Sequence, residues 1–234
     1  MANTVVKVKL ARDLRAKNKS EAAELRSLFK RHGVCVLNIL GSPGAGKTTL
    51  LEESLPKLST DLRIAVIEGD LYTARDAERL AQSNIQVVQI NTEGGCHLDA
   101  PMIGGVAHEL PLSQLDLLII ENVGNLVCPA GFDLGEDATA VVLSVTEGDD
   151  KPEKYPQVFR EADVILLSKT DLLPYVPFNL PEVRDVLYSL NQKAPVLELS
   201  AIKGDGFVSW LDWVRQLVEQ KRGETHGCES ARAR

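Results

Sequence analysis

The segment GSPGAGKT at residues 41–48 contains the residue types that bind a nucleoside triphosphate. It fits the pattern G-x-x-x-x-G-K-[ST], which forms a phosphate-binding loop when a strand precedes it and a helix follows. Its glycines allow backbone N–H groups to surround phosphate without a Cβ clash. We expect Lys47 to contact the β- and γ-phosphates and Thr48 to hold Mg²⁺. The expected contacts of this loop with nucleotide come from Gly41, Gly44, Ala45, Gly46, Lys47, Thr48 and Thr49.

Acidic residues stand at the ends of two predicted strands. In parallel sheets the ligand lies beyond the carboxyl ends of the strands. In DLLIIEN, Glu121 closes the strand at the nucleotide end, whereas Asp116 opens it and is expected to be solvated at the far end. In IEGD, we expect Asp70 in the Mg²⁺ shell, with Asp76 as the second choice and a helix N-cap as the alternative role of Asp70. Lys47, Asp70 and Glu121 are therefore the expected catalytic residues.

Two short segments indicate which base is bound. SKTD, at residues 168–171, follows an apolar run and resembles the guanine motif N-K-x-D, with Ser in the first place. We expect the Asp171 carboxylate to accept hydrogen bonds from guanine N1–H and the N2 amine, a donor pair that adenine lacks, and the Lys169 stem to cover the base. Ser200 and Ala201, in LSAIK after the next strand, resemble the second base loop. Together the two segments favour GTP over ATP.

A Cys-His pair and a distant Cys could bind a metal. Cys96 and His97 lie in NTEGGCHLDA, and Cys128 lies shortly after Gly124, which resembles the γ-phosphate-sensing glycine of GTPase switch elements. These side chains suit borderline and soft ions such as Zn²⁺ and Ni²⁺. Adjacent ligands can share one metal only in irregular backbone, which the two preceding glycines permit. The alternative is a small buried Cys and a polar loop His; three ligands would leave a fourth position to water, another protein group or a partner subunit.

The bulk composition indicates a globular protein and disfavours nucleic-acid and membrane partners. The 234 residues are 44% hydrophobic and carry a net charge of −7, whereas binding to a phosphate backbone needs clustered cations. No apolar run approaches the roughly 20 residues of a membrane helix, and the N-terminal segment has no apolar signal region. We therefore expect a cytoplasmic protein whose four Cys are free thiols or metal ligands rather than disulfides.

Strand-like apolar runs alternate with helix-like stripes along the chain. Strands are predicted near 34–40, 63–68, 85–89, 115–120, 140–145, 164–167 and 196–199. Helices are predicted near 12–32, 46–58, 74–82, 98–108, 181–191 and 206–220. This alternation predicts an α/β P-loop NTPase fold with a mostly parallel sheet and helices on both faces, and it disfavours a chance Gly-rich turn at residue 41. We expect one GTPase domain over residues 1–220, including an N-terminal helix, and a disordered tail over 221–234.

Seven segments together resemble the hydrogenase nickel-incorporation GTPases, the HypB family. They are GSPGAGKTTLL, EGDLYTARDAERL, GGCHLDAPMI, IIENVGNLVCPAGFDLGE, VVLSVTEGDDKPEKYP, SKTDLLPY and LSAIKGDG. The likeness runs from about residue 20 to residue 220, nearly the whole chain. CHLDA and ENVGNLVCP are its specific parts, since the related urease GTPase family has a C-P-H arrangement that this chain lacks.

The resemblance implies a metallochaperone that hydrolyses GTP and supplies Ni²⁺ during maturation of nickel–iron hydrogenase. It implies that Cys96, His97 and Cys128 bind Ni²⁺ or Zn²⁺ near the interface of a GTP-dependent homodimer, with GTP or GDP and Mg²⁺ at the phosphate loop. Independently of the resemblance, Cys128 lies on the segment that leaves Gly124, so movement of that segment on hydrolysis would couple metal affinity to the nucleotide state. The implied partners are a HypA-like zinc protein and the hydrogenase large subunit. Lys151 or Lys154 could reach a nucleotide across the dimer.

The sequence also departs from some members of that family. It contains neither their N-terminal C-x-x-C-G-C nickel site nor their His-rich tract, so the Cys-His site is expected to be the only nickel site. Three alternatives have weaker support. A GTPase chaperone of a cobalamin enzyme would not need the Cys-His pair, a small-molecule P-loop kinase would not need the guanine motif, and a metal-storage protein would not need the phosphate loop. A GTPase chaperone of another metalloenzyme stays open as an alternative.

Overall fold

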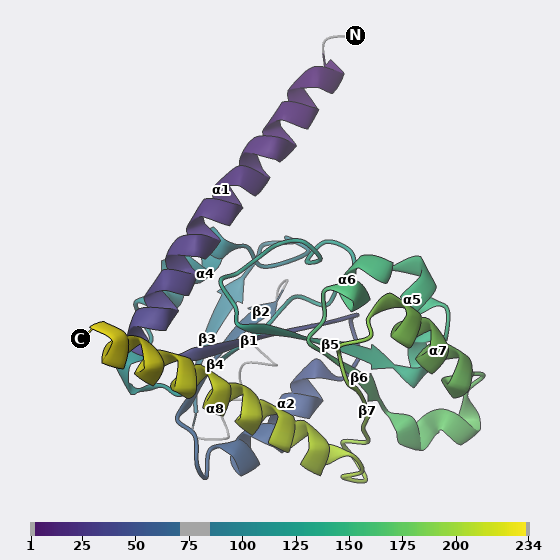
Figure 1. The fold of residues 1–234 in the computed structure, drawn as a ribbon. Coiled ribbons are helices and arrows are strands. Elements are labelled where there is room, and N and C mark those ends of the chain that lie inside the picture. Colours follow the sequence, from purple (N-terminus) through teal and green to yellow (C-terminus); the bar gives the residue numbers. More distant parts are fainter. Residues whose placement is uncertain (1–2, 71–84, 233–234) are drawn as a thin grey trace.

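The computed structural model describes residues 3–70 and 85–232, and in these residues seven strands form one parallel sheet (Figure 1). The strands are β1 (Cys35–Gly41), β2 (Ile64–Asp70), β3 (Gln86–Asn91), β4 (Leu117–Glu121), β5 (Ala138–Ser144), β6 (Val164–Ser168) and β7 (Val196–Glu198). Their order is β3-β2-β4-β1-β5-β6-β7, and every neighbouring pair is parallel. The predicted α/β fold with a parallel sheet is thus confirmed.

The strand β1 lies in the middle of the sheet, between β4 and β5. Its residue Ile39 pairs with Glu121 of β4 on one side and with Ala140 of β5 on the other. On the next strand along, Glu68 of β2 pairs with the same Glu121. Because all strands run in one direction, the carboxyl ends of β1, β2 and β4 lie at one edge of the sheet. That carboxyl edge is where ligands bind in open α/β sheets.

Helices cover both faces of the sheet. They are α1 (Asn3–His32), α2 (Lys47–Leu58), α4 (Ala100–Ala107), α5 (Lys151–Lys154), α6 (Pro156–Arg160), α7 (Leu180–Leu190) and α8 (Phe207–Arg232), with short 3-10 helices at Leu112–Gln114, Val145–Glu147 and Thr170–Tyr175. The helices α2 and α8 pack on one face, and α1, α4, α6 and α7 pack on the other. The N-terminal part of α1 extends away from the body of the molecule (Figure 1).

Burial on both faces explains the continuous apolar runs of the central strands. In β1, Leu37 and Ile39 pack with α2 and α8, whereas Val36 and Leu40 pack on the opposite face. A strand covered on both faces needs apolar residues at successive positions rather than at alternate ones. Asn38 is the polar exception, and it is 1% exposed. Its amide donates to Glu136 at 3.1 Å, which satisfies it inside the core.

Two expectations about the chain ends and helix boundaries need correction. The first helix begins at Asn3 rather than near residue 12. The last helix continues to Arg232, so residues 221–232 are helical where we expected a disordered tail. The side chain of Lys221 accounts for part of this, because it is 8% exposed and pairs with Asp137. The helix expected near 74–82 lies outside the described residues.

Asp116 lies at the far end of β4 from the phosphate loop, as expected, but the expectation that it is solvated is wrong. Its side chain is 13% exposed and pairs with Arg63 at 2.9 Å and with Arg222 of α8 at 2.9 Å. The sequence places Asp116 at the strand start, but only the packing of α8 brings the second arginine to it.

Within the described part of the chain, no helix has the length and apolar character needed to cross a membrane.

Candidate functional site

The phosphate loop follows β1 and leads directly into α2. Gly44 and Gly46 have positive φ angles of 75° and 96°, a conformation that residues with side chains rarely adopt. Lys47 begins α2, and its Nζ lies 3.3 Å from the Gly41 carbonyl and 3.4 Å from the Ser42 carbonyl. The loop therefore has the geometry of an anion site at a helix N-terminus.

A cleft of about 350 Å³ lies beside this loop. Its lining includes the predicted residues Gly44, Gly46, Lys47, Thr48, Thr49, Glu121, Gly124 and Lys169, together with Glu68. Residues from three strand ends and from the segment after β6 thus face one cavity. Eight of the predicted site residues therefore lie around one cleft, whose lining does not include Gly41 and Ala45. Their contacts with nucleotide stay a prediction.

Two carboxylates lie side by side next to Thr48. Its Oγ1 donates to Oε1 of Glu121 at 2.7 Å, and Glu68 is directly across from Glu121 in the strand register. Glu68 is 2% exposed and Glu121 is 3% exposed. Hydroxyl and carboxylate oxygens are the hard donors that Mg²⁺ prefers, so this donor set fits the ion.

Glu68 was not singled out by sequence analysis, although a signal for it exists. It stands two residues before Asp70, and residues two apart face the same side of a strand. The structure describes Asp70 as the last residue of β2, at the expected edge of the sheet. The role of Asp70 in the Mg²⁺ shell stays a prediction, and Asp76 lies outside the described residues.

The segment after β4 packs directly against the phosphate loop. A Cβ on Gly124 would lie 2.9 Å from both N and Cα of Pro43, so only glycine fits there. The next residue, Asn125, donates its backbone N–H to the Gly41 carbonyl at 2.9 Å. The expected γ-phosphate sensor is thus held against the loop through main-chain contacts.

The predicted base motif follows β6 and contacts the phosphate loop. Ser168 donates its hydroxyl to the Ala45 carbonyl at 2.6 Å, so serine in the first motif position still bonds to the loop. Lys169 has a left-handed backbone with φ 59°. Its Nζ donates to the Gly44 carbonyl at 2.6 Å. The lysine stem therefore runs between the base motif and the phosphate loop.

Asp171 lines a second, mostly apolar pocket of about 160 Å³. The Ser200 hydroxyl donates to Oδ1 of Asp171 at 2.7 Å and fixes that carboxylate. The pocket is also lined by Lys169, Leu172, Leu199, Ala201 and Phe207. An apolar slot with a fixed carboxylate matches a purine that carries two adjacent N–H donors. The two predicted base segments therefore form one pocket.

Cys96, His97 and Cys128 come together at the same edge of the sheet. One donor atom from each lies within 4.8 Å of the others, and Cys96 Sγ is 3.5 Å from Nδ1 of His97. Cys96 is exposed and Cys128 is half-buried. Two sulfur ligands and one imidazole suit Zn²⁺ or Ni²⁺ and leave a fourth position open. The cluster favours a metal site over the alternative of a small buried Cys and a polar loop His.

The local environment sets the protonation of these ligands. The neighbouring Cys128 thiol, together with burial, raises the pKa of Cys96. Burial lowers the pKa of His97, whose ring lies 4.0 Å from the Phe132 ring, centroid to centroid. A neutral imidazole is ready to ligate, whereas thiols must lose their protons when metal binds. In contrast, burial inside β1 raises the pKa of Cys35 to about 12, and this cysteine packs in the core.

An irregular loop makes it possible for the adjacent Cys96 and His97 to belong to one cluster. Glu93 and Gly94 have positive φ angles of 49° and 92°, so the chain turns sharply after β3. Asp99 then caps the start of α4 by accepting a backbone N–H through its side chain. The ligand pair thus lies in non-helical backbone, as the two glycines predicted.

A buried asparagine ties this loop to β4, and sequence analysis did not single it out. Asn122 is 1% exposed, and its Oδ1 accepts from the backbone N–H of Leu98 and of Val123, both at 3.0 Å. The asparagine therefore links the metal loop to the segment that carries the γ-phosphate sensor. Its position directly after Glu121, at a strand end, was the available signal.

Comparison with known proteins places this arrangement in a family. The family model described as CobW/HypB/UreG, nucleotide-binding domain, matches residues 35–198. Hydrogenase maturation factor HypB of Azotobacter chroococcum is 46% identical over 216 residues, which cover 92% of this chain and 70% of that protein. The HypB of Escherichia coli K12 is 47% identical over 202 residues, covering 86% and 70%.

Solved structures agree with the sequence comparison. The crystal structure of HypB from Archaeoglobus fulgidus has a TM-score of 0.82 at 38% identity and covers 87% of this chain and 99% of that one. The nickel complex of HypB from Helicobacter pylori has a TM-score of 0.81 at 40% identity and covers 89% and 97%. The signal recognition particle receptor FtsY from Elizabethkingia anophelis shares the fold, with a TM-score of 0.52 at 15% identity. At these identities and coverages, the chain belongs to the HypB family of hydrogenase maturation factors.

Proposed function

We propose that this hydrogenase maturation factor is a GTP-hydrolysing nickel metallochaperone whose affinity for nickel depends on the bound nucleotide. The observation that carries the proposal is the path of one segment. It begins at Gly124, which packs on Pro43 of the phosphate loop, and continues to the metal ligand Cys128. A shift of this segment on hydrolysis would move a metal ligand, and by linkage metal would alter nucleotide affinity by the same factor.

Hydrolysis of GTP rests on charge and positioning around the phosphate loop. Lys47 and the loop amides hold the phosphates, and Asp171 selects guanine. Thr48 and Glu121 would hold Mg²⁺, with Asp70 as a further candidate, and the bound ion would supply positive charge that stabilises the phosphates. Replacing Lys47 by Ala removes the main cationic contact and is expected to abolish hydrolysis. GTP turnover by that variant at the wild-type rate would contradict the catalytic assignment.

Nickel is the proposed cargo, and zinc is the competing ion. The two thiols and one imidazole accept either ion, and the likeness to the nickel complex of the Helicobacter pylori protein supports nickel. Water or a partner group would fill the fourth position. The reducing cytosol, which is the proposed location, would keep the exposed Cys96 thiol and its neighbour available for metal.

The proposed partners are a second copy of the chain in its GTP state, a HypA-like zinc protein and the hydrogenase large subunit. Val127 supports an interface near the metal site, because it is 56% exposed and directly precedes Cys128. Lys151 and Lys154 both pair with Asp150 on the surface. A role for either lysine at a nucleotide across the dimer would require that pair to open.

Two alternative functions fit the geometry less well. A GTPase chaperone of a cobalamin enzyme has no use for the cluster at Cys96, and a small-molecule kinase has no use for the carboxylate that Ser200 fixes in the base pocket.

Metal titration tests the proposed coupling. Ni²⁺ and Zn²⁺ are titrated by calorimetry into the GDP form and into the form with a non-hydrolysable GTP analogue. We expect affinities that differ by about 5- to 150-fold between the two states. Identical affinities in protein that binds both ligands would show that the metal site is structural and that the coupling is wrong.

A further inference from the structure

Asn125 joins the phosphate loop to the backbone of both thiol ligands. Its side-chain Nδ2 donates to the Cys96 carbonyl at 3.2 Å. Its Oδ1 accepts from the N–H groups of Val127 at 2.8 Å and of Cys128 at 3.4 Å. One amide therefore links the two segments that carry the sulfur ligands. Cys96 and Cys128 themselves lie 32 residues apart in sequence.

The backbone of the same residue is bonded to the phosphate loop. Asn125 donates its N–H to the Gly41 carbonyl at 2.9 Å, and it directly follows Gly124. A Cβ on Gly124 would lie 2.9 Å from Pro43, so the glycine packs closely on the phosphate loop. A γ-phosphate that engages Gly124 would act on the peptide that Asn125 shares with it. Any such change reaches Cys96 and Cys128 together through one short side chain.

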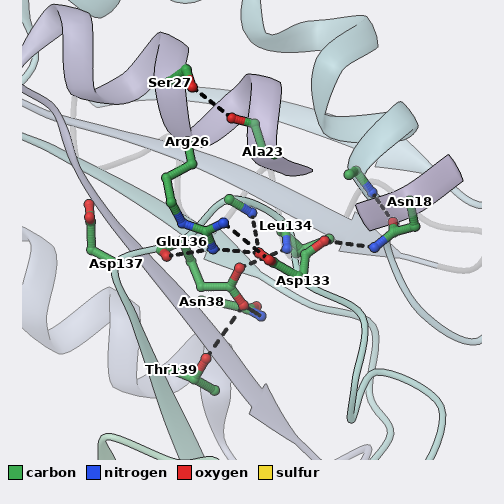
Figure 2. Close-up of polar contacts among 12 residues, drawn as sticks. Asn18, Ala23, Arg26, Ser27, Asn38, Asp133, Leu134, Glu136, Asp137 and Thr139 are labelled. Carbon is green, nitrogen blue, oxygen red and sulfur yellow. Dashed lines mark hydrogen bonds and ion pairs between the residues drawn. The ribbon is translucent and has the colours of Figure 1, made fainter. Parts of the chain in front are cut away.

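A second asparagine also spans the two ligand segments but approaches them from α1. Asn18 is 6% exposed, and its Nδ2 donates to the Asp133 carbonyl at 2.8 Å while its Oδ1 accepts from the Ala100 N–H at 2.8 Å (Figure 2). Arg26 of the same helix holds the Asp133 carboxylate at 2.7 and 3.1 Å. Ala100 follows Cys96 and His97 in the sequence, and Asp133 follows Cys128, whereas Gly124 precedes Cys128. Asn18 therefore contacts each segment at a point beyond its ligand in the sequence.

We propose that Asn125 is the positioning residue through which the nucleotide state changes the spacing of the two thiols, and that Asn18 holds the same segments independently of nucleotide. The inference rests on the proposed nickel–nucleotide coupling and assigns that coupling to one side chain. Asn125 acts through the backbone of Cys96 and Cys128 and is not itself a metal ligand. Asn18 supplies a control, since its amide likewise donates to one of the two segments and accepts from the other, with one bond of each kind.

The experiment compares full-length wild type with Asn125→Ala, Asn125→Asp and Asn18→Ala. Ni²⁺ alone is titrated into the GDP form and the GTP-analogue form of each protein, with GDP affinity and thermal unfolding measured as checks on folding. Asp in place of Asn125 keeps an acceptor for the Cys128 N–H but loses the donor to the Cys96 carbonyl. It therefore tests the bond between the two segments with little change in side-chain size, and it serves if the Ala variant does not fold.

We expect both Asn125 variants to bind GDP as the wild type does and to bind Ni²⁺ equally in the two nucleotide states. Asn18→Ala should lower Ni²⁺ affinity in both states by a similar factor and keep their ratio. If both folded Asn125 variants keep the wild-type ratio of Ni²⁺ affinities between the two nucleotide states, the role of Asn125 is wrong, although the proposed coupling stands. An equal loss of this ratio in Asn18→Ala would also contradict the role of Asn125. Equal Ni²⁺ affinities of the wild type in the two nucleotide states would overturn the proposed coupling and, with it, this inference.

Discussion

The hydroxyl of Thr48 lies 2.7 Å from Oε1 of Glu121, a carboxylate 73 residues away in sequence. Thr48 is in the first turn of α2, and Glu121 is the last residue of β4. The parallel register of β2 and β4 sets Glu68 beside this pair. A hydroxyl and two buried carboxylates next to a phosphate loop form an oxygen-rich site for Mg²⁺.

Replacing Glu121 by Gln should lower GTP hydrolysis and leave GDP binding largely intact. The amide keeps a hydrogen-bond acceptor for Thr48 but removes the negative charge that attracts Mg²⁺. We expect kcat to fall about 100-fold or more, the scale of losing one electrostatic contact at a reacting centre. Steady-state hydrolysis measured over a Mg²⁺ series checks this. An unchanged kcat with unchanged Mg²⁺ dependence would remove Glu121 from the catalytic assignment.

Replacing Asp171 by Asn should change the preferred base. The carboxylate that Ser200 fixes at 2.7 Å is expected to accept from two guanine donors. Asn keeps one acceptor oxygen, so one hydrogen bond to a charged group is lost. Such a bond contributes about 1.5–3 kcal/mol, so GTP affinity should fall about 10- to 150-fold. Xanthosine triphosphate should gain, because it presents an acceptor where guanine presents the amine. Competition binding checks the shift, with the exposed Asp205→Asn as control; equal binding of ATP and GTP by the wild type would sink the base assignment.

Replacing Cys128 by Ser should remove most of the nickel affinity. A soft thiolate becomes a hard and mostly protonated hydroxyl. The loss should exceed the roughly 10- to 100-fold typical of a lost outer-shell partner. GDP affinity should survive, because Cys128 lies beyond Gly124 along the segment. Cys35→Ala is the control, since the Cys35 thiol is buried in β1. The nickel affinity of this variant should match that of the wild type. Nickel binding retained by Cys128→Ser would place the ion elsewhere.

Replacing Ser54 by Ala should destabilise the packing of α8 on α2. The indole Nε1 of Trp210 donates to the Ser54 hydroxyl at 2.9 Å, and both residues are 0% exposed. Leaving a buried donor without its partner costs about 1–3 kcal/mol. Urea unfolding measures the loss. Ser59→Ala, at the exposed C-terminus of α2, should change the free energy of unfolding little, and equal effects of the two changes would refute the role of this hydrogen bond.

Replacing Asp116 by Asn should reduce the acid sensitivity of the fold. The guanidinium groups of Arg63 and Arg222 hold the pKa of Asp116 well below its usual range. A carboxyl whose pKa is lower in the folded state stabilises the protein above its unfolded pKa of about 3.9, and this contribution is lost as the pH falls through the folded value. Free energies of unfolding at neutral and acidic pH should therefore differ more in the wild type than in the variant. Parallel pH profiles would contradict this account.

Local pattern predicted the strands, most of the helices and several residues at the strand ends, but not the bounds of the first and last helices. The run VCVLNIL predicted a strand buried on both faces, and the loop at residues 41–48 followed from the spacing of Gly, Lys and Thr. Strand direction then placed Glu121 at the nucleotide edge and Asp116 at the opposite one. The same reasoning brought the two base segments together at Asp171, because parallel strands deliver their ends to one edge.

Tertiary structure alone decided which side chains from separate elements meet. The register of β2 against β4 put Glu68 beside Glu121, and the packing of α8 brought Arg222 to Asp116. Nothing near Asn18 in the sequence indicates that it would reach Ala100, since that contact depends on how α1 lies over the sheet. Periodicity reports which face of an element is buried, whereas register and helix placement come from contacts between residues distant in sequence. The sequence by itself therefore predicted the candidate sites, and the tertiary structure decided which side chains join them.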